Sequence, residues 1–423
     1  MAALHVVIIG AGVVGITTAW QLQKQGVSVT LVERQAEAGV ETSFGNAALQ
    51  HPSLVDPWNA PGVGWDLLRW IGRDDAPMLL HLSKLPSLAL WGLRFLANST
   101  PERHKANTLK NLRLALLARR EMSEIRAATN IQYGWKTTGV ISAARTPETM
   151  RAAIRAAELV APHGVTYRTL SRDETVSLEP ALAPIAEVLE GSVYFPDEER
   201  CDSYLFCREM TRLLQQRGVT FHFNTALNHI RAEGGRIRSI QTTAGEIETE
   251  VLVLAAGSYS PAILSPLGID LPVRPAKGYS ATIHCKGNPH KPNIPVSDSS
   301  VHAAVTPLDD ERVRVAGTAE FAGYDTTVRQ PRVDNLLSLL QKIYPKLSQT
   351  IRPEDISPWA GLRPMSSDGV PTISRTRYAN LFLNTGHGHI GWTTAAGSAR
   401  LASDLICDLP PVLDMRDYSI DRF

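Results

Sequence analysis

Aliphatic and β-branched side chains are concentrated in four short runs along the chain. Residues 5–9, 27–32, 251–255 and 381–383 form these runs, and such runs are typical of strands buried in a parallel sheet. A predicted helix, residues 13–25, follows the first run and ends at Gly26, a plausible C-cap. The pattern predicts strand–helix units near both ends of the chain and a further parallel-type strand in the middle.

Other segments follow different periods. Residues 277–285 and 312–322 alternate like antiparallel strands, whereas residues 102–127 and 146–162 read as amphipathic helices. Residues 207–245 read as a helix, a strand and a hairpin meander with glycine turns. Because 423 residues are long for one hydrophobic core, we expect two domains.

Composition narrows the function classes. Hydrophobic residues make up 43% and charged residues 20%, ordinary for a folded soluble protein. The net charge of +1 provides no field that would recruit nucleic acid. None of the four cysteines has CxxC spacing, which argues against a zinc, iron–sulfur or other metal site and suggests a reducing compartment. We therefore expect a cytoplasmic protein, with peripheral contact on the inner face of the cell membrane as an alternative.

The first strand leads into Gly10, Gly12 and Gly15, in the order G-x-G-x-x-G. Gly10 permits a tight turn, Gly12 lets the backbone approach a pyrophosphate, and Gly15 lets the helix lie close to the strand. Glu33 ends the second strand, where a carboxylate bonds the hydroxyls of an adenosine ribose. The motif predicts a dinucleotide site and disfavours NADP; the alternative is a packing turn without a ligand.

The rest of the chain favours FAD over NAD. Residues 41–58, ETSFGNAALQHPSLVDPW, form a small polar segment instead of a further helix, and Ser43 and Asn46 in it could bond a pyrophosphate or flavin edge. An ordinary surface loop is the alternative. A second glycine-rich loop, residues 386–391, precedes another helix, whose N-terminus would stabilise negative charge on a reduced flavin.

Together these segments resemble the D-amino-acid oxidase superfamily of FAD-dependent oxidoreductases, and most closely its bacterial D-amino-acid dehydrogenases of the small-subunit type. The matching stretches run in family order from Val6 to about Asp408. They are GAGVVGITTAWQL, ETSFGNAALQHPSLVDPW, LPVRPAKGYSAT, VRVAGTAE, WAGLRPMSSDGVPTIS and NTGHGHIGWTTAAGS. The last two are far more specific than the N-terminal glycines.

The resemblance implies an α/β plus α+β fold. A Rossmann-like, GR2-type FAD-binding domain would comprise residues 1–58, 200–270 and 356–423. It would be interleaved with an antiparallel-sheet substrate domain of residues 59–199 and 271–355. Because no cysteine lies between Cys285 and Cys407, we expect the FAD to be non-covalent.

The expected FAD contacts come from both glycine turns and the segments between them. They are Gly10, Gly12, Val13, Val14, Gly15, Glu33, Arg34, Ser43, Asn46, Ala47, Leu49, Leu227, Ala256, Gly257, Gly361, Gly386, His387, Gly388, Ile390, Gly391, Trp392 and Thr393. His51, also within the polar segment, is a further candidate to lie over the flavin.

In this superfamily the arginine of a G-[LF]-R-P motif pairs with the substrate carboxylate, and Arg363 holds that position. A planar two-donor fork fixes a carboxylate in one orientation. The alternative is a structural arginine paired with Asp368 or Glu354. The resemblance implies hydride transfer from the substrate Cα to flavin N5, giving an imino acid and then a keto acid and ammonia. It implies no dedicated general base, and orientation would provide the rate.

Two further residues are candidates for the substrate site. His389 would donate to the substrate carboxylate or hydroxyl, or only bond its own loop; His387 is expected to serve the loop or contact the flavin. Tyr279 matches the dehydrogenase pattern and either faces the substrate or lies on the apolar face of its strand. Ala303 and Ala304 stand where some oxidases have a tyrosine, which puts oxidase-like recognition in doubt.

The expected partners are an amino or imino acid substrate and an electron acceptor such as a quinone. Residues 65–97 combine tryptophans and leucines with basic residues, which suits a membrane interface; two helices packed in the substrate domain are the alternative. Competing functions are a D-proline or D-hydroxyproline dehydrogenase, a glycine/sarcosine-type amine oxidase that produces hydrogen peroxide, and a flavoprotein-fold subunit without catalysis.

Overall fold

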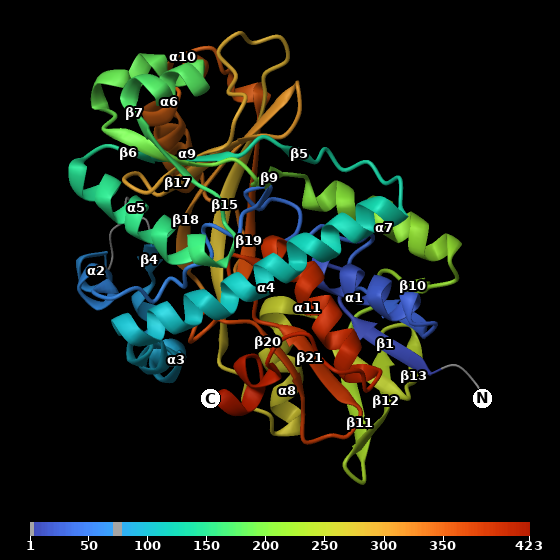
Figure 1. Ribbon diagram of the computed structural model, residues 1–423. Coiled ribbons are helices and arrows are strands. Elements are labelled where there is room, and N and C mark those ends of the chain that lie inside the picture. Colours follow the sequence, from blue (N-terminus) through green and yellow to red (C-terminus); the bar gives the residue numbers. More distant parts are fainter. Residues whose placement is uncertain (1–3, 71–77) are drawn as a thin grey trace.

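The computed structural model describes residues 4–70 and 78–423 and contains two large sheets (Figure 1). A six-stranded sheet contains the predicted parallel strands and lies nearer both termini. Its order is β10 (Thr220–His222), β2 (Ser28–Val32), β1 (His5–Ile9), β14 (Val251–Leu254), β21 (Leu381–Thr385) and β20 (Thr372–Arg375). All neighbours are parallel except β20 and β21.

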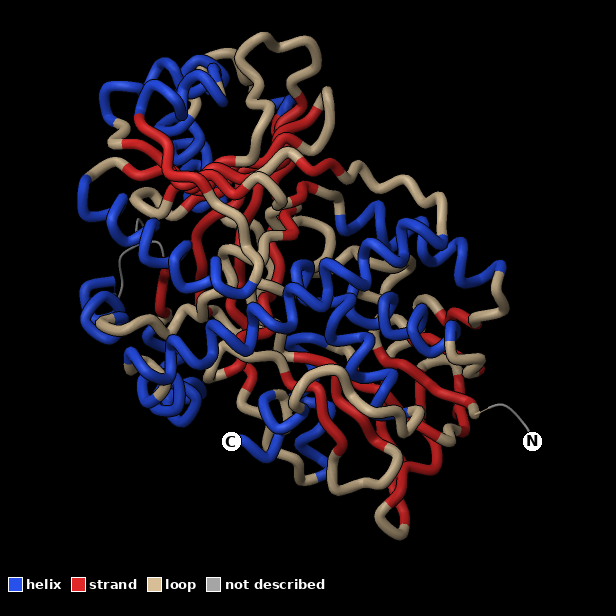
Figure 2. The backbone as a smooth tube through the Cα atoms, viewed as in Figure 1, coloured by secondary structure: helices blue, strands red, loops and turns tan. Residues whose placement is uncertain are grey.

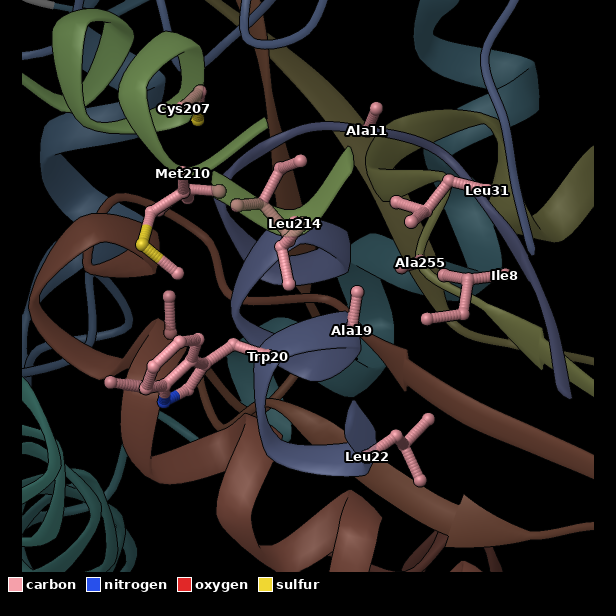
Figure 3. Packing of buried hydrophobic residues seen from close by; sticks show 14 of the residues in the cluster. Ile8, Ala11, Ala19, Trp20, Leu22, Leu31, Cys207, Met210, Leu214 and Ala255 are labelled. Atoms are coloured by element: carbon pink, nitrogen blue, oxygen red, sulfur yellow. The ribbon is translucent and has the colours of Figure 1, made fainter. Parts of the chain in front are cut away.

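Both faces of this sheet are covered, which explains the uninterrupted apolar runs. Val6 and Ile8 pack toward α1 and its neighbours, whereas Val7 and Ile9 pack in a cluster on the other face. Figure 3 shows the first cluster around Trp20. The helices on that side are α1 (Val13–Lys24), α4 (Pro101–Ala128), α7 (Ser203–Gln216) and α11 (Gly391–Ile406). The other side carries α8 (Ser260–Leu264) and the meander β11 (Leu227–Glu233), β12 (Arg236–Thr242) and β13 (Gly245–Glu248).

The second sheet has nine strands, mostly antiparallel. Figure 2 draws the strands of both large sheets in red. Its order is β19 (Ile356–Ser366), β15 (Val273–His284), β18 (Arg312–Phe321), β17 (Ala303–Pro307), β16 (Val296–Asp298), β6 (Val140–Ala144), β8 (Gly191–Phe195) and β7 (Arg168–Ser171), with β4 (Met78–Leu80) beside β18. The other helices are α2 (Val63–Trp70), α3 (Leu85–Ala97), α5 (Pro147–Val160), α6 (Arg172–Leu178), α9 (Gln330–Ile343) and α10 (Pro345–Ser348).

A further short sheet links distant parts of the chain. Strands β3 (Leu49–Gln50) and β5 (Lys136–Thr137) both pair with β9 (Glu199–Arg200). The polar segment 41–58 also contacts both parts of the fold: Thr42 Oγ1 donates to the Leu362 oxygen of β19 at 2.8 Å, and Ser43 Oγ accepts the Val13 N–H at the start of α1 at 3.0 Å.

Two segments lie elsewhere than the predicted domain boundaries imply. Strand β19 falls after the boundary at residue 356, yet it pairs with β15 from Ile356 to Ser366 and so belongs to the nine-stranded sheet. Helix α4 was assigned to the substrate part, yet Met122 and Ile125 pack in the core beside α1. Helix α4 packs both beside α1 and against β8 of the nine-stranded sheet, and β19 joins that sheet by pairing with a distant strand; neither contact is visible in the order of the sequence.

Candidate active site

A cavity of about 860 Å³ lies between the two large sheets. Its walls come from the carboxyl ends of β1, β2 and β14 on one side and from β15, β17, β18 and β19 on the other. Ligands of open α/β sheets bind at the carboxyl ends of the strands. The cavity therefore joins the predicted dinucleotide turn to the predicted substrate sheet.

The first glycine turn borders the cavity at Gly10 and Gly12. A Cβ on Gly10, whose φ is +103°, would lie 2.7 Å from the Ala255 carbonyl oxygen, and one on Gly15 would lie 1.9 Å from the Gly10 oxygen. These two glycines are required by packing, and Gly15 does not line the cavity. The nearest atom to a Cβ on Gly12 is Ser43 Oγ at 3.4 Å. Gly12 thus leaves room for a phosphate beside the N-terminus of α1.

The polar groups around this turn fit a dinucleotide. Ser43 Oγ accepts the Val13 N–H at 3.0 Å and keeps a proton to donate. The two carboxylate oxygens of Glu33 accept the N–H groups of Ala11 (2.8 Å) and Gln35 (2.9 Å), and each has a further lone pair for a ribose hydroxyl. Burial raises the pKa of Glu33 despite these bonds.

Arg34 and the polar segment complete this part of the wall. The Arg34 guanidinium lies 3.8 Å from the centre of the Tyr259 ring and pairs with Glu41. Asn46 lines the cavity, but its amide nitrogen donates to Ser203 Oγ (2.6 Å) and its amide oxygen accepts the Ala48 N–H (2.9 Å). The amide of Asn46 therefore holds the segment in place, and the surface-loop alternative for residues 41–58 does not describe it.

The second glycine loop contributes Gly388, His389, Gly391 and Trp392 to the wall. His387 also borders the cavity, and its Nε2 lies 2.9 Å from Ser398 Oγ on α11. Burial lowers the pKa of His387 to about 3. His387 is therefore a neutral residue that fastens the loop to its helix.

Three predicted FAD contacts in this loop are not part of the wall. Gly386 adopts a φ of +75°, which the turn requires. Ile390 is buried in an apolar cluster with Val55, and Thr393 Oγ1 donates to the Leu49 oxygen at 3.4 Å. The remaining predicted contacts line the cavity, namely Val13, Val14, Ala47, Leu49, Leu227, Ala256, Gly257 and Gly361, together with His51.

Arg363 lies on β19 and borders the cavity as a half-buried cation. Burial alone lowers its pKa to about 10. Its Nη1 donates to the Thr318 oxygen at 3.3 Å, and its guanidinium carbon lies 5.4 Å from the centre of the Trp58 ring. A Cβ on Gly278 would lie 2.1 Å from Nη1, so the facing strand leaves space for the guanidinium only because it has glycine there.

Arg363 does not pair with Asp368 or Glu354, the two partners that a purely structural role would involve. Asp368 pairs with Arg422 at 2.7 Å, and Glu354 pairs with Arg352 at 3.2 Å. Within residues 4–70 and 78–423, no carboxylate forms an ion pair with Arg363. A guanidinium that is partly removed from water and has no anion beside it is destabilised, and the cavity is where an anionic ligand would neutralise it.

His389 stands beside Arg363 with its ring stacked on Trp58, 5.4 Å between centres. Burial, with smaller contributions from His51 and Arg363, lowers the pKa of His389 to about 3. His389 is therefore neutral near pH 7 and can donate one hydrogen bond without adding charge.

Tyr279 does not line the cavity. Its ring is buried among apolar residues on the other face of β15, and its hydroxyl donates to Glu320 Oε2 at 2.7 Å. Of the two predicted placements, the structure therefore has Tyr279 on the apolar face of its strand. Successive side chains of a strand point to opposite faces, and the neighbouring residue Gly278 faces the cavity.

Several cavity residues were not singled out from the sequence. Trp58 stacks on His389, Trp359 lies against Gly45 and Gly361, and Thr318 bonds Arg363. Trp58 and Trp359 lie within the quoted family stretches, so aromatic residues there were available as a signal. The bulge of β18 that holds Thr318 has no sequence signal of its own.

Comparisons with known proteins agree on one family. A family model described as "FAD dependent oxidoreductase" matches residues 5–405. D-amino acid dehydrogenases of Paramagnetospirillum magneticum and Vibrio vulnificus are each 40% identical, covering 99% and 95% of this chain and 99% and 96% of theirs.

Solved structures of lower identity share the fold. Glycine oxidase from Geobacillus kaustophilus has a TM-score of 0.77 at 21% identity and covers 100% of both chains. L-proline dehydrogenase from P. horikoshii has a TM-score of 0.75 at 18% identity and covers 99% of this chain and 96% of its own.

Proposed function

The chain belongs to the family of FAD-dependent oxidoreductases, and from this premise we propose that it oxidises D-amino acids to keto acids and ammonia. The electrons pass to an acceptor other than oxygen. The observation that carries the substrate class is Arg363, a half-buried cation that lines the cavity and has no carboxylate partner among the described residues. The name shared by the 40%-identical relatives supports the D-configuration.

The residues that would hold FAD are those of the two glycine turns and the polar segment. Glu33 would accept the ribose hydroxyls, and the N-terminus of α1 with Ser43 would hold the pyrophosphate. The loop at Gly388 and Gly391 would lie at the other end of the ligand. When bound, FAD supplies the acceptor for the hydride that leaves the substrate Cα.

The protein's own task is to bind and orient the amino acid. Arg363 would hold the carboxylate through two parallel bonds, while His389 would donate a further bond to the carboxylate or to a substrate hydroxyl. Trp58, which packs against both side chains, would keep water from them. No side chain is needed as a base if the substrate loses its ammonium proton before reaction.

The test is anaerobic reduction of the purified holoenzyme by panels of D- and L-amino acids and imino acids, followed by flavin absorbance. The proposal predicts bleaching by D-amino acids, with turnover that needs a dye or quinone. Bleaching confined to D-proline or D-hydroxyproline would favour the cyclic-substrate alternative, and substantial hydrogen peroxide in air would favour the oxidase. The fold does not choose among these, because the structural neighbours include enzymes named for glycine and for L-proline.

We also propose that α2 and α3 contact the membrane that holds the acceptor. Trp65, Leu90 and Leu93 are 72%, 60% and 67% exposed. The two helices pack together, since a Cβ on Gly64 would lie 3.4 Å from Leu96. Trp91, by contrast, is buried, and residues 71–77 of the predicted surface lie outside the described residues.

Membrane contact is tested by flotation of the holoenzyme with anionic lipid vesicles. The L90E/L93E variant should float less and reduce vesicle-embedded quinone more slowly, with unchanged dye turnover. V188E, at another exposed apolar residue, is the matched control. Equal flotation of both variants and the wild type would reject the contact. Within the described part of the chain, no helix combines the length and apolarity needed to cross a bilayer.

A further inference from the structure

Asp56 is a carboxylate of the cavity wall that neither the FAD contacts nor the arginine fork accounts for. The other carboxylates of the wall have partners within the protein, namely Glu33 (two backbone N–H groups), Glu41 (Arg34) and Asp298 (Arg145). In residues 4–70 and 78–423, the carboxylate of Asp56 forms no hydrogen bond or ion pair with another residue. In that part of the chain, the wall therefore contains an acid without a counter-ion as well as Arg363, a cation without one.

The local sequence directs the side chain of Asp56 toward the cavity. Asp56 precedes Pro57, and a residue before proline adopts an extended backbone. Burial alternates accordingly, since Val55 and Pro57 are buried whereas Asp56 is exposed and Trp58 half-buried. Asp56 and Trp58 both line the cavity. The backbone is fixed in this orientation, because the Val55 oxygen accepts Nδ2 of Asn111 at 3.0 Å.

The carboxylate of Asp56 is enclosed by protein although the cavity reaches it. This enclosure raises the pKa of Asp56, while the charge of His104 and the N–H of Asp56 itself favour the ionised form. His104 does not neutralise the acid, because its Nε2 donates to the Pro57 oxygen at 3.1 Å. A cation inside the cavity would stabilise the ionised carboxylate.

Asp56 and Arg363 occupy separate places in the wall. The Trp58 ring centre lies 5.4 Å from the guanidinium carbon of Arg363, and Asp56 precedes Trp58 by about 7 Å of extended backbone. Opposite charges within about 6 Å would shift each other's pKa, yet burial alone shifts that of Arg363 and His104 is the charged residue that acts on Asp56. The two charges are therefore farther apart than neighbouring α-carboxylate and α-amino groups would require.

We infer that Asp56 binds a cationic group at the end of the substrate side chain, so that the enzyme favours basic D-amino acids such as D-arginine. This rests on the proposed function. Arg363 would hold the α-carboxylate, and three methylene groups would carry the substrate guanidinium away from Cα toward Asp56. One substrate would then neutralise both unpaired charges of the wall.

A cation suits Asp56 better than a neutral side chain does. A hydroxyl group could donate one hydrogen bond but would leave the enclosed carboxylate without a counter-charge. A guanidinium supplies two parallel donors and the charge. Substrates with neutral side chains would still bind through Arg363, with lower affinity.

The test compares the wild-type holoenzyme with D56N, which keeps the shape of the side chain and removes its charge. The ligands are D-arginine, D-citrulline, which has a neutral urea in place of the guanidinium, and 5-guanidinopentanoate, which lacks the α-amino group and is not oxidised. Dissociation constants come from anaerobic flavin reduction for the amino acids, and from flavin spectra and thermal shift for 5-guanidinopentanoate. D310N is the matched control, because Asp310 is exposed and lies outside the cavity wall.

The wild type should bind D-arginine roughly 10-fold more tightly than D-citrulline. D56N should bind D-arginine and 5-guanidinopentanoate roughly 10-fold more weakly than the wild type, with D-citrulline affinity within twofold; D310N should behave like the wild type.

Three results would overturn the inference. Unchanged D-arginine binding in D56N would mean that Asp56 meets no cation. Equal weakening of D-arginine and D-citrulline, with 5-guanidinopentanoate unaffected, would mean that Asp56 binds the α-amino group. Equal weakening of all three ligands would assign Asp56 a structural role. Failure of the proposed function would appear differently, as a wild-type flavin that no D-amino acid reduces.

Discussion

Replacing Arg363 by methionine should weaken substrate binding and stabilise the substrate-free fold. Methionine replaces the guanidinium by an unbranched apolar side chain without charge. If Arg363 serves to bind substrate, its removal stabilises the substrate-free protein. If Arg363 were one half of a structural ion pair, its removal would destabilise the protein. R363M therefore distinguishes the two roles.

Both magnitudes follow from the structure. The carboxylate would lose a buried, charge-assisted partner, and truncation of such a pair costs about 2–5 kcal/mol, or about 30-fold or more in affinity. In the free enzyme, burial lowers the pKa of Arg363 to about 10, a penalty on its charged form of about 3 kcal/mol. Removing the charge removes this penalty, and the melting temperature should rise by roughly 2–5 °C.

The assay is a thermal melt of the holoenzyme with and without a saturating carboxylate ligand, together with the dissociation constant from flavin spectra. The wild type should gain stability from the ligand, whereas R363M should start higher and gain little. R363K, which keeps the charge and loses the fork, should bind about 10-fold more weakly. A variant R363M that melts several degrees lower and still binds the ligand normally would refute the reasoning.

Three further predictions concern the turn, the strand tyrosine and the buried histidines. G15A should lose several kcal/mol of unfolding free energy in urea titrations and purify without flavin, because its Cβ would overlap a carbonyl oxygen at 1.9 Å. Y279F should keep its KM, since Tyr279 lies outside the cavity, and lose about 1–3 kcal/mol because buried Glu320 loses a donor; a raised KM would put Tyr279 in the site. Burial lowers the pKa of His387 and His389 from 6.5 to about 3. Between these two pH values the unfolded chain therefore binds protons on both histidines and the folded chain does not. The stabilising contribution of the two neutral histidines is complete above pH 6.5 and falls by up to about 1.4 kcal/mol per pH unit for each histidine as the pH drops toward 3. In urea titrations between pH 7 and pH 5, H389Q should therefore lose less unfolding free energy than the wild type. An unchanged pH dependence would contradict the burial of a neutral ring.

Strands with a regular pattern of apolar side chains were predictable from the sequence. The apolar runs at 5–9 and 251–255 correspond to β1 and β14, and the alternation at 277–285 overlaps β15 up to His284, because the side-chain period directly reflects which strand faces are buried. The boundary at residue 356 was not predictable, since β19 joins the substrate sheet only through pairing with a strand some 80 residues away.

The candidate site likewise has some residues that short sequence motifs predict and others that depend on strand register. The glycine turns and Arg363 have short motifs, and the structure brings them to one cavity. Tyr279 belongs to a matching stretch, but a single position of register decides that Gly278 faces the cavity and Tyr279 does not. Thr318 depends on a bulge between β15 and β18, which local sequence patterns do not encode.

The most direct test of the account is flavin absorbance under anaerobic conditions after addition of D-alanine and L-alanine to wild type and R363M. The account predicts rapid bleaching of the wild type by the D-enantiomer, little by the L-enantiomer, and none of R363M at the same concentration. Purified protein without a flavin spectrum, or bleaching of R363M at the wild-type concentration dependence, would contradict it.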